Sequence, residues 1–418
     1  MPAARQNLMG SRIVQRIDAL AAISESPAAL TRICFSPEHR RAADLILRWM
    51  EEAGLTARMD EIGNVIGRYE GDAPGLPCLM IGSHFDTVRD AGKWDGPLGV
   101  LTSIECVAEV ARRGLRLPFA LEVVAFADEE GVRFSSTLLG SRAVAGTFDY
   151  GALEAVDADG LTMREAMEAF GLKPGAIRKA ARKRGEILAY TELHIEQGPA
   201  LEVENVPVGV VTAISGASRF IIELEGMTGH AGTVPMHLRR DALAGAAKCI
   251  AAVERLCGGQ PGLVGTVGQI AAEPGATNVV AGRVRFTLDI RAAEDERRKD
   301  AVSAVIDAVD EIASRRRLKA RITKTHDNRT AVCAPWLRDQ LGAAIAESGH
   351  RVLDLPSGAG HDGMAMIDIA DIAMLFVRCR GGISHHPDEH VSAEDVEAAA
   401  RVLMRFIENF RPQAEARS

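Results

Sequence analysis

A buried β-strand is predicted by the run Cys78-Leu79-Met80-Ile81-Gly82, which is short, apolar and uncharged. A helical pattern follows from Leu98 to Arg113, and a second apolar run covers Leu121 to Phe126. This alternation of strand and helix is typical of α/β proteins, in which helices cover both faces of a mixed, mostly parallel sheet. We therefore expect an α/β fold around these segments.

The pattern changes near residue 213, where strands and helices come in a different order. Strands are expected at 220–226, 263–270, 284–290 and 320–325, and helices at 241–257 and 294–315. The order strand-helix-strand-strand-helix-strand is the ferredoxin-like signature. The sequence therefore predicts an inserted α+β domain at residues 213–330, within a larger domain formed by residues 1–212 and 331–418.

Composition narrows the class of protein. A chain of 418 residues with 47% hydrophobic residues fits two globular domains. The net charge of −8 argues against nonspecific nucleic-acid binding, which depends on basic patches. The seven cysteines are dispersed, without a CxxC pair, as expected of reduced thiols. Because neither a signal-peptide pattern nor an apolar membrane span is present in the sequence, we expect a cytoplasmic protein without membrane attachment.

Residues that ligate metals stand in several short Gly-rich or acidic motifs. These motifs are His84-Phe85-Asp86, Asp95-Gly96, Glu129-Glu130-Gly131, His194-Ile195-Glu196 and His385-His386. The first and third follow predicted strands, and sites in open α/β sheets gather at the carboxyl ends of strands. Carboxylate and imidazole ligands suit zinc or manganese. If the motifs converge in space, they indicate a hydrolytic site with two metal ions.

Each residue also has a plainer interpretation. Asp86 could fix the ring of His84 by contacting its other nitrogen. Asp95 could bridge two ions, or it could only cap the helix that follows it. Glu129 and Glu130 could divide metal binding and proton transfer between them, or they could form an exposed acidic turn.

Another group of candidates would contact a substrate. His230, in Gly229-His230-Ala231-Gly232, could polarise a substrate oxygen or could be an ordinary loop histidine. Arg291 ends a predicted strand that Asn278 flanks, and its planar fork suits a carboxylate as well as a surface ion pair. The loop 357–362 offers backbone amides and His361, but it lacks the GxSxG pattern of a serine nucleophile.

Together and in this order, the motifs resemble the dinuclear metallohydrolase superfamily of aminoacylases and carboxypeptidase-G-type peptidases. More narrowly, they look like its amidase branch, the allantoate amidohydrolases and N-carbamoyl-L-amino-acid hydrolases. The matching segments are Gly82–Val88, Lys93–Val100, Glu129–Phe134, Glu192–Pro199, Gly229–Met236, Ser357–Asp362 and Gly381–His385. The resemblance spans nearly the whole chain. Gly363 departs from it, because this branch more often has alanine there.

The resemblance implies a role for each matching residue. Two divalent ions per subunit, zinc or manganese, would be held by His84, Asp95, Glu130, His194 and His385, with Asp95 bridging. Glu129 would be the general base and acid. The substrate would be bound by Gln197, Arg219, His230, Asn278, Arg291, Gly360 and His361. The inserted domain would act as a lid and as the contact of a homodimer, in which His230 reaches the site of the partner subunit.

The resemblance also implies an activity. The enzyme would cleave a ureido C–N bond of a small carboxylate substrate, with release of ammonia and carbon dioxide. The run Val88 to Asp95 favours conversion of allantoate to ureidoglycine over hydrolysis of an N-carbamoyl-L-amino acid. A dipeptidase or aminoacylase on the same scaffold is a further alternative. A non-catalytic binding protein with the same fold is another, although the presence of Glu129 argues against it.

Overall fold

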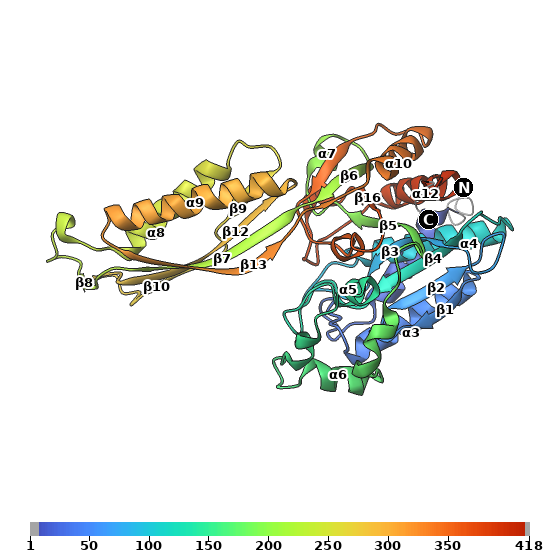
Figure 1. Cartoon of the computed structure of the whole chain (residues 1–418), viewed down its shortest axis with the longest axis horizontal. Coiled ribbons are helices and arrows are strands. Elements are labelled where there is room, and N and C mark those ends of the chain that lie inside the picture. The colour runs from blue at the N-terminus through green and yellow to red at the C-terminus, as the bar shows by residue number, and fades with distance from the viewer. Residues whose placement is uncertain (1–7, 414–418) are drawn as a thin grey trace. The chain divides into compact units, whose positions relative to one another are not determined.

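The structure is a computed structural model of the chain, and it describes residues 8–413. The chain forms two compact units (Figure 1). Unit 1 comprises Met1–Thr212, Cys333–Leu355 and Ala359–Ser418, and unit 2 comprises Ala213–Val332 and Pro356–Gly358. Among the described residues, no helix combines the length and apolar character needed to cross a membrane.

The sheet of unit 1 is mixed, and its parallel part lies at the centre. Its strands are ordered β1 (Thr56–Met59), β2 (Val65–Tyr69), β4 (Ala120–Phe126), β3 (Cys78–His84), β5 (Ile187–Ile195), β16 (Ile372–Val377) and β6 (Val208–Ile214). The neighbours β4, β3, β5 and β16 are parallel, whereas β1, β2 and β6 pair antiparallel. Parallel pairing is therefore confined to the central strands, and two of these, β3 and β4, match the apolar runs at 78–82 and 121–126.

Helices cover both faces of this sheet. The main core takes apolar residues from α2 (Met9–Ala21), α3 (Pro37–Glu52), α4 (Pro97–Arg112), α10 (Pro335–Glu347) and α12 (Ala393–Asn409). From β5 this core takes Leu193 and Ile195, so the alternating side chains of Glu192 and His194 face the other side. On that side α11 (Gly363–Met366) contacts β5 and β16, and α5 (Leu139–Ala145) packs against α11.

Local sequence signals explain where several helices begin. Helix α12 starts at the predicted cap, where Ser392 Oγ accepts a hydrogen bond of 3.0 Å from the backbone N–H of Asp395. Helix α3 starts in the same way, since Ser36 accepts from the N–H of His39 and Pro37 takes the first helical position. The shorter helices α6 (Met163–Phe170) and α7 (Ala200–Val203) belong to unit 1. The strands β14 (Ala331–Val332) and β15 (Asp354–Ser357) both pair with β6 and so extend the nine-stranded sheet.

Unit 2 has the predicted order of elements. They are β7 (Gly216–Glu225), α8 (Ala242–Cys257), β9 (Leu263–Thr266), β10 (Ile270–Glu273), β12 (Arg283–Ala292), α9 (Asp295–Arg315) and β13 (Lys319–Asn328), with the short pair β8 (Gly229–His230) and β11 (Val279–Val280). The antiparallel sheet runs β10-β12-β7-β13, and β9 also pairs with β12. The single strand expected at 263–270 is thus two strands. Helices α8 and α9 pack on the sheet through a separate apolar core.

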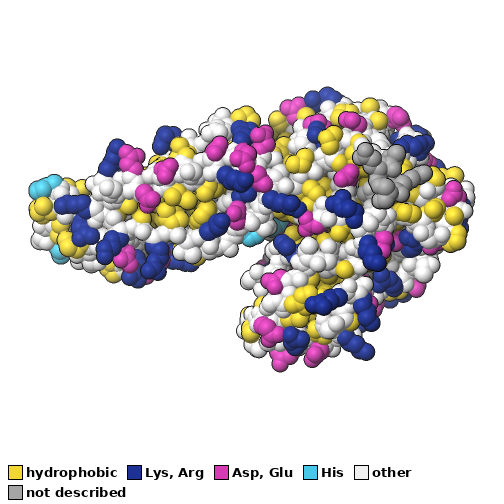
Figure 2. All heavy atoms as spheres, viewed as in Figure 1, with side chains coloured by type: hydrophobic (Ala, Val, Ile, Leu, Met, Phe, Trp, Pro, Cys, Tyr) yellow, Lys and Arg dark blue, Asp and Glu magenta, His cyan; other side chains and the backbone are white. Residues whose placement is uncertain are grey.

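The surface carries charges of both signs. Figure 2 shows Lys and Arg side chains together with Asp and Glu side chains over the visible face of each unit. The net charge of −8 is therefore not gathered in one acidic region of this face.

Candidate functional site

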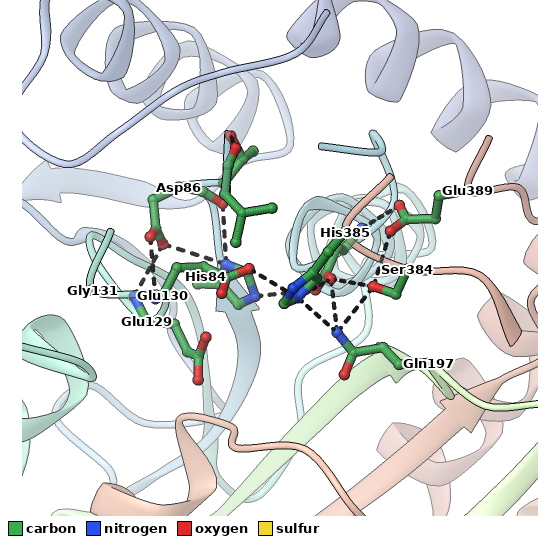
Figure 3. Close-up of polar contacts among 12 residues, drawn as sticks. His84, Asp86, Glu129, Glu130, Gly131, Gln197, Ser384, His385 and Glu389 are labelled. Atoms are coloured by element: carbon green, nitrogen blue, oxygen red, sulfur yellow. Dashed lines mark hydrogen bonds and ion pairs between the residues drawn. The ribbon is translucent and has the colours of Figure 1, made fainter. Parts of the chain in front are cut away.

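The predicted metal-ligating side chains of unit 1 meet at the carboxyl ends of the central strands. His84 is the last residue of β3, and His194 is the penultimate residue of β5. Glu129 and Glu130 follow the end of β4, and the loop after β16 brings in His385 (Figure 3). Parallel strands end at the same edge of a sheet, which explains why motifs far apart in the sequence converge here.

Among residues 8–413, three groups place potential ligand atoms within 4.8 Å of one another. These groups are His84-Asp95-His194, His84-Glu129-Glu130 and Asp95-Glu130-His385. Each of the five predicted ligands belongs to at least one group, and the groups overlap because they share residues. A set of imidazoles and carboxylates without thiolates fits zinc or manganese. The geometry therefore suits neighbouring cations, while the ligand role of each residue stays a prediction.

Asp95 occupies the middle of the cluster. Its Oδ1 lies 3.0 Å from Nε2 of His194 and 3.5 Å from Nε2 of His84, and its Oδ2 lies 3.2 Å from Nε2 of His385. The alternative interpretation of Asp95 as a helix cap is wrong, because α4 is preceded by Gly96 and has no side-chain cap. Asp95 instead directs its two oxygens at different histidines.

Gly96 allows Asp95 and His84 to approach each other. Its φ of 82° lies in the left-handed region, which favours glycine. A Cβ atom at Gly96 would also lie 2.5 Å from the ring of His84. Both the backbone conformation before α4 and the nearby ring of His84 therefore require glycine at position 96.

Asp86 fixes the orientation of His84, as the sequence predicted. Nδ1 of His84 lies 3.2 Å from the backbone oxygen of Asp86 and 3.3 Å from its Oδ1, which leaves Nε2 directed at Asp95. Asp86 also accepts hydrogen bonds from the backbone N–H groups of Glu129 (3.1 Å) and Glu130 (3.3 Å). Burial acts to raise the pKa of Asp86, but the contacts with His84 and the backbone N–H of Glu129 together outweigh it, and the pKa is lowered.

The two glutamates are held in an environment that opposes negative charge. Burial, followed by repulsion from Glu130, raises the pKa of Glu129 well above its usual range. Burial, followed by the charge of Asp95, raises the pKa of Glu130 to about 7. Carboxylates gathered in this way are stabilised by nearby cations, so the electrostatics of the cluster also fit metal binding.

Gln197 and two residues without a predicted role form a polar network around Asp95. Nε2 of Gln197 donates to Oδ2 of Asp95 (2.8 Å) and to Oγ of Ser384 (3.1 Å), and Ser384 Oγ donates to the same Asp95 oxygen (2.7 Å). Glu389 contacts both Ser384 and the backbone at Asp95. Ser384 stood inside a quoted motif, whereas the only signal for Glu389 was its position four residues after His385.

Glu196 and His386 point away from the cluster. Glu196 accepts hydrogen bonds from the N–H groups of Ala200 (2.7 Å) and Leu201 (2.9 Å), so it stabilises the start of α7. His386 is exposed, and its Nδ1 accepts from the N–H of Asp388 at 3.2 Å. Their exclusion from the predicted ligand set agrees with these contacts.

The loop before α11 also contacts residues of the candidate metal cluster. The ring of His361 packs edge-on against that of His194, with centroids 4.5 Å apart. Burial, followed by the charge of His194, lowers the pKa of His361 well below its usual range, so the ring is neutral. A Cβ atom at Gly360 would lie 3.6 Å from Oε1 of Glu129. Gly360 and His361 thus lie beside residues of the candidate metal centre.

The arginines predicted to bind substrate lie together in unit 2. Arg291 makes two parallel contacts with Asp289, Nε to Oδ1 at 3.0 Å and Nη2 to Oδ2 at 2.9 Å, and Nη1 donates to Gly358 O at 2.7 Å. Arg219 contacts Oδ2 of Asp289 at 3.0 Å. Arg291 therefore does form the ion pair that was its alternative interpretation, with Asp289 as partner. Two guanidinium groups and one carboxylate nevertheless leave this cluster with a net positive charge.

His230 and Asn278 are neighbours at the other end of the same sheet. His230 pairs with Val279 in the β8-β11 ladder, and Asn278 O accepts a hydrogen bond of 2.9 Å from the N–H of Ala231. β8 follows the end of β7 that pairs with Arg283, whereas Arg291 lies eight residues further along β12 (Figure 1). At roughly 3.3 Å per residue, about 26 Å of strand separates the two ends. One small molecule therefore cannot contact His230 and Arg291 of the same chain.

Known proteins resemble this chain over nearly its whole length. It is 43% identical over 380 residues to an N-carbamoyl-L-amino-acid amidohydrolase of Pseudomonas sp. (strain NS671), covering 90% of this chain and 92% of the relative. It is 39% identical to an allantoate deiminase of Arabidopsis thaliana, covering 97% and 83% of the two chains. A crystal structure of an amidase of the hydantoinase/carbamoylase family from Burkholderia multivorans superposes with a TM-score of 0.89 at 33% identity, covering 96% of this chain and 97% of the other.

The family assignment rests on the same region that builds the site. The model of peptidase family M20/M25/M40 matches residues 80–409, which include most of β3, the candidate metal cluster and all of unit 2. The relatives are named as hydrolases of C–N bonds, in agreement with the resemblance inferred from the motifs. The chain belongs to peptidase family M20/M25/M40.

Proposed function

We propose that this protein is a metal-dependent amidohydrolase that cleaves a ureido C–N bond of a small carboxylate substrate. The observation that carries the proposal is the convergence of His84, Asp95, Glu130, His194 and His385 in overlapping groups, one of which also contains Glu129. These five residues would hold two divalent ions, zinc or manganese, with Asp95 between them. When bound, the ions supply Lewis-acid activation of water and of the ureido carbonyl group.

Glu129 would move the proton. It accepts a proton from the attacking water, whose oxygen adds to the carbonyl carbon, and it returns that proton to the leaving nitrogen as the C–N bond breaks. Burial, and then Glu130, raise its pKa, so this carboxyl group takes up a proton more readily than an ordinary glutamate does. Hydrolysis of the terminal C–N bond in this way releases ammonia and leaves a carbamic acid. The carbamic acid then loses carbon dioxide as its remaining C–N bond breaks and its acid proton moves to the nitrogen, which gives the amine.

Arg291 would recognise the substrate carboxylate. A guanidinium group has five N–H donors, and the hydrogen bonds to Asp289 and Gly358 use three of them. One N–H on each Nη remains available to a substrate carboxylate. Arg219 adds positive charge through the shared Asp289. Gln197, Gly360 and His361 would contact the ureido end, since they lie beside the candidate metal cluster.

His230 and Asn278 would complete the site of a partner subunit. The roughly 26 Å of strand between them and Arg291 supports this assignment, because both ends of the sheet are proposed to bind one small substrate. We therefore propose a homodimer that is joined through unit 2, which also closes over the substrate. In the partner's site, His230 would stabilise the negative charge that develops on the carbonyl oxygen.

The proposed substrate is allantoate, and N-carbamoyl-L-amino acids are the second candidate. Similarity to the allantoate deiminase, at 39% identity, supports allantoate. Similarity to the N-carbamoyl-L-amino-acid amidohydrolase, at 43% identity, supports N-carbamoyl-L-amino acids. We also propose a cytoplasmic location, which fits seven cysteines that are all free and buried.

The test uses purified protein supplied with zinc or manganese, and it measures ammonia release from allantoate and from N-carbamoyl-L-amino acids. Glu129→Gln is the matched control, because it keeps the shape of the side chain but cannot accept the proton. We expect the variant to retain its metal and to lose several orders of magnitude in rate, at least about 10³-fold. Turnover of acylated amino acids without ammonia would instead indicate an aminoacylase. An unchanged rate in the variant would falsify the role of Glu129.

A further inference from the structure

Glu389 joins the two loops that carry Asp95 and His385. Its Oε1 accepts hydrogen bonds from the consecutive backbone N–H groups of Trp94 (2.8 Å) and Asp95 (3.1 Å). Its side chain lies on the same loop as His385, and the residue is only 4% exposed (Figure 3). A buried carboxylate with two backbone donors is held in a defined position, and it holds those donors in return.

Ser384 extends this connection to the side chain of Asp95. Ser384 Oγ lies 2.7 Å from Oδ2 of Asp95 and 3.2 Å from Oε2 of Glu389. A hydroxyl group has a single proton, and the shorter contact assigns it to Asp95. Glu389 therefore supports Asp95 directly through the backbone N–H, and its Oε2 lies beside the hydroxyl group of Ser384 that donates to Asp95 Oδ2.

Glu389 packs tightly against the backbone of Gly92. A Cβ atom at Gly92 would lie 2.3 Å from Cβ, Cδ and Oε1 of Glu389. Gly92 has no left-handed φ, so alanine would be restricted there by Glu389 rather than by the backbone. The position of Glu389 can thus be disturbed without changing Glu389 itself.

We propose that Glu389 is a positioning residue that sets the metal affinity of the site by orienting Asp95 relative to His385. It acts through hydrogen-bond geometry, because its oxygens are directed at backbone amides and at Ser384 and none belongs to the ligand groups. This inference rests on the proposed role of Asp95 and His385 as ligands. Loss of a side chain that orients a metal ligand typically weakens metal affinity by about 10- to 100-fold.

The experiment measures the dissociation constants of Zn²⁺ and Mn²⁺ by competition with a chromophoric chelator, on the full chain and on four variants. Glu389→Ala is expected to weaken binding at least about tenfold. Glu389→Gln is expected to stay within about threefold of wild type, because its amide oxygen still accepts from both N–H groups and its Nε2 donates to Ser384 Oγ. Gly92→Ala should behave like Glu389→Ala although Glu389 is retained.

Glu105→Ala is the matched control, since Glu105 is an equally buried glutamate on α4 that pairs with Arg12 and Arg112. It is expected to lower the thermal midpoint without changing metal affinity. Equal affinity in wild type and Glu389→Ala, an affinity loss in Glu389→Gln as large as in Glu389→Ala, or an equal loss in Glu105→Ala would each overturn the inference. Should Glu389→Ala not fold, Gly92→Ala provides the same comparison. A wild-type protein that binds no metal would instead overturn the proposed function.

Discussion

At the scale of single residues, the site is set by close contacts that a sequence pattern shows only in part. Gly96 is required twice, by its left-handed backbone and by the ring of His84. Asp86 serves His84 and the backbone of both glutamates at once. Substitutions at such positions should therefore affect the candidate metal centre as well as stability.

Gly96→Ala should destabilise the protein and reduce its metal content. The left-handed φ alone costs about 1–2 kcal/mol for a residue with a Cβ, and the 2.5 Å approach to His84 adds to that cost. Gly114→Ala is the matched control, because Gly114 has a φ of 64° at the other end of α4 but nothing within 4 Å of its Cβ position. Thermal midpoints and bound metal should fall further in Gly96→Ala. Equal effects in both variants would mean that the contact with His84 does not matter.

His39 should make stability depend on pH. Burial is the main cause that lowers its pKa to about 3, whereas an unfolded histidine has a pKa of about 6.5. Above pH 6.5, His39 is neutral in both the folded and the unfolded state. As the pH falls from 6.5 toward 3, only the unfolded state binds a proton at His39, so the free energy of unfolding decreases. Between pH 7.5 and pH 5 this loss amounts to about 2 kcal/mol.

The measurement compares the free energy of unfolding of wild type and His39→Asn at both pH values. Asparagine keeps an acceptor for the N–H of Phe35, which donates to Nδ1 of His39 at 3.3 Å. The penalty of the substitution should shrink by about 2 kcal/mol on going to pH 5. A penalty for His39→Asn that is constant with pH would contradict the assignment.

At the scale of elements, the strand β12 presents its charged residues in a fixed row. Arg285 and Arg291 lie on the same face of the sheet, because side chains that are an even number of residues apart on a strand point to the same face. Only Arg291 is held by Asp289 and Gly358. On this face, Arg291 is therefore oriented by hydrogen bonds, whereas Arg285 is exposed.

Arg291→Lys should raise KM for the carboxylate substrate at least about tenfold with a smaller effect on kcat, because lysine lacks the planar fork. Arg285→Lys, on the same strand and face, should leave both constants near wild type. A KM that is unchanged in Arg291→Lys would remove Arg291 from substrate binding. Steady-state rates of ammonia release provide both constants.

The sequence predicted elements better than the contacts between them. Apolar runs located β3 and β4 because fully buried strands need continuous apolar side chains, and the cap at Ser392 located the start of α12. The sequence did not separate β9 from β10. It also assigned no role to Glu389, because hydrogen bonds to the backbone of a segment nearly 300 residues away leave no local pattern.

At the scale of the whole molecule, the proposed sites are shared between subunits. His230→Ala and Glu129→Gln homodimers should both be nearly inactive, since each lacks one component of every site. Mixing and reassembling them in equal amounts should restore about a quarter of wild-type activity, because half of the dimers are mixed and each has one intact site. Glu130→Ala mixed with Glu129→Gln is the control and should restore nothing, since both residues belong to the same chain's site. Absence of recovery in the first mixture would contradict the shared site.

The length of the unit 2 sheet has a further consequence for how such an enzyme would behave in a cell. Under the proposed arrangement, a monomer holds halves of two sites and completes neither, so turnover follows the dimer concentration. Specific activity would then fall on dilution below the dissociation constant of the dimer, and substrate that bridges both subunits would oppose that fall by mass action. The amount of enzyme that a cell makes would thus set the activity of each copy as well as the number of copies.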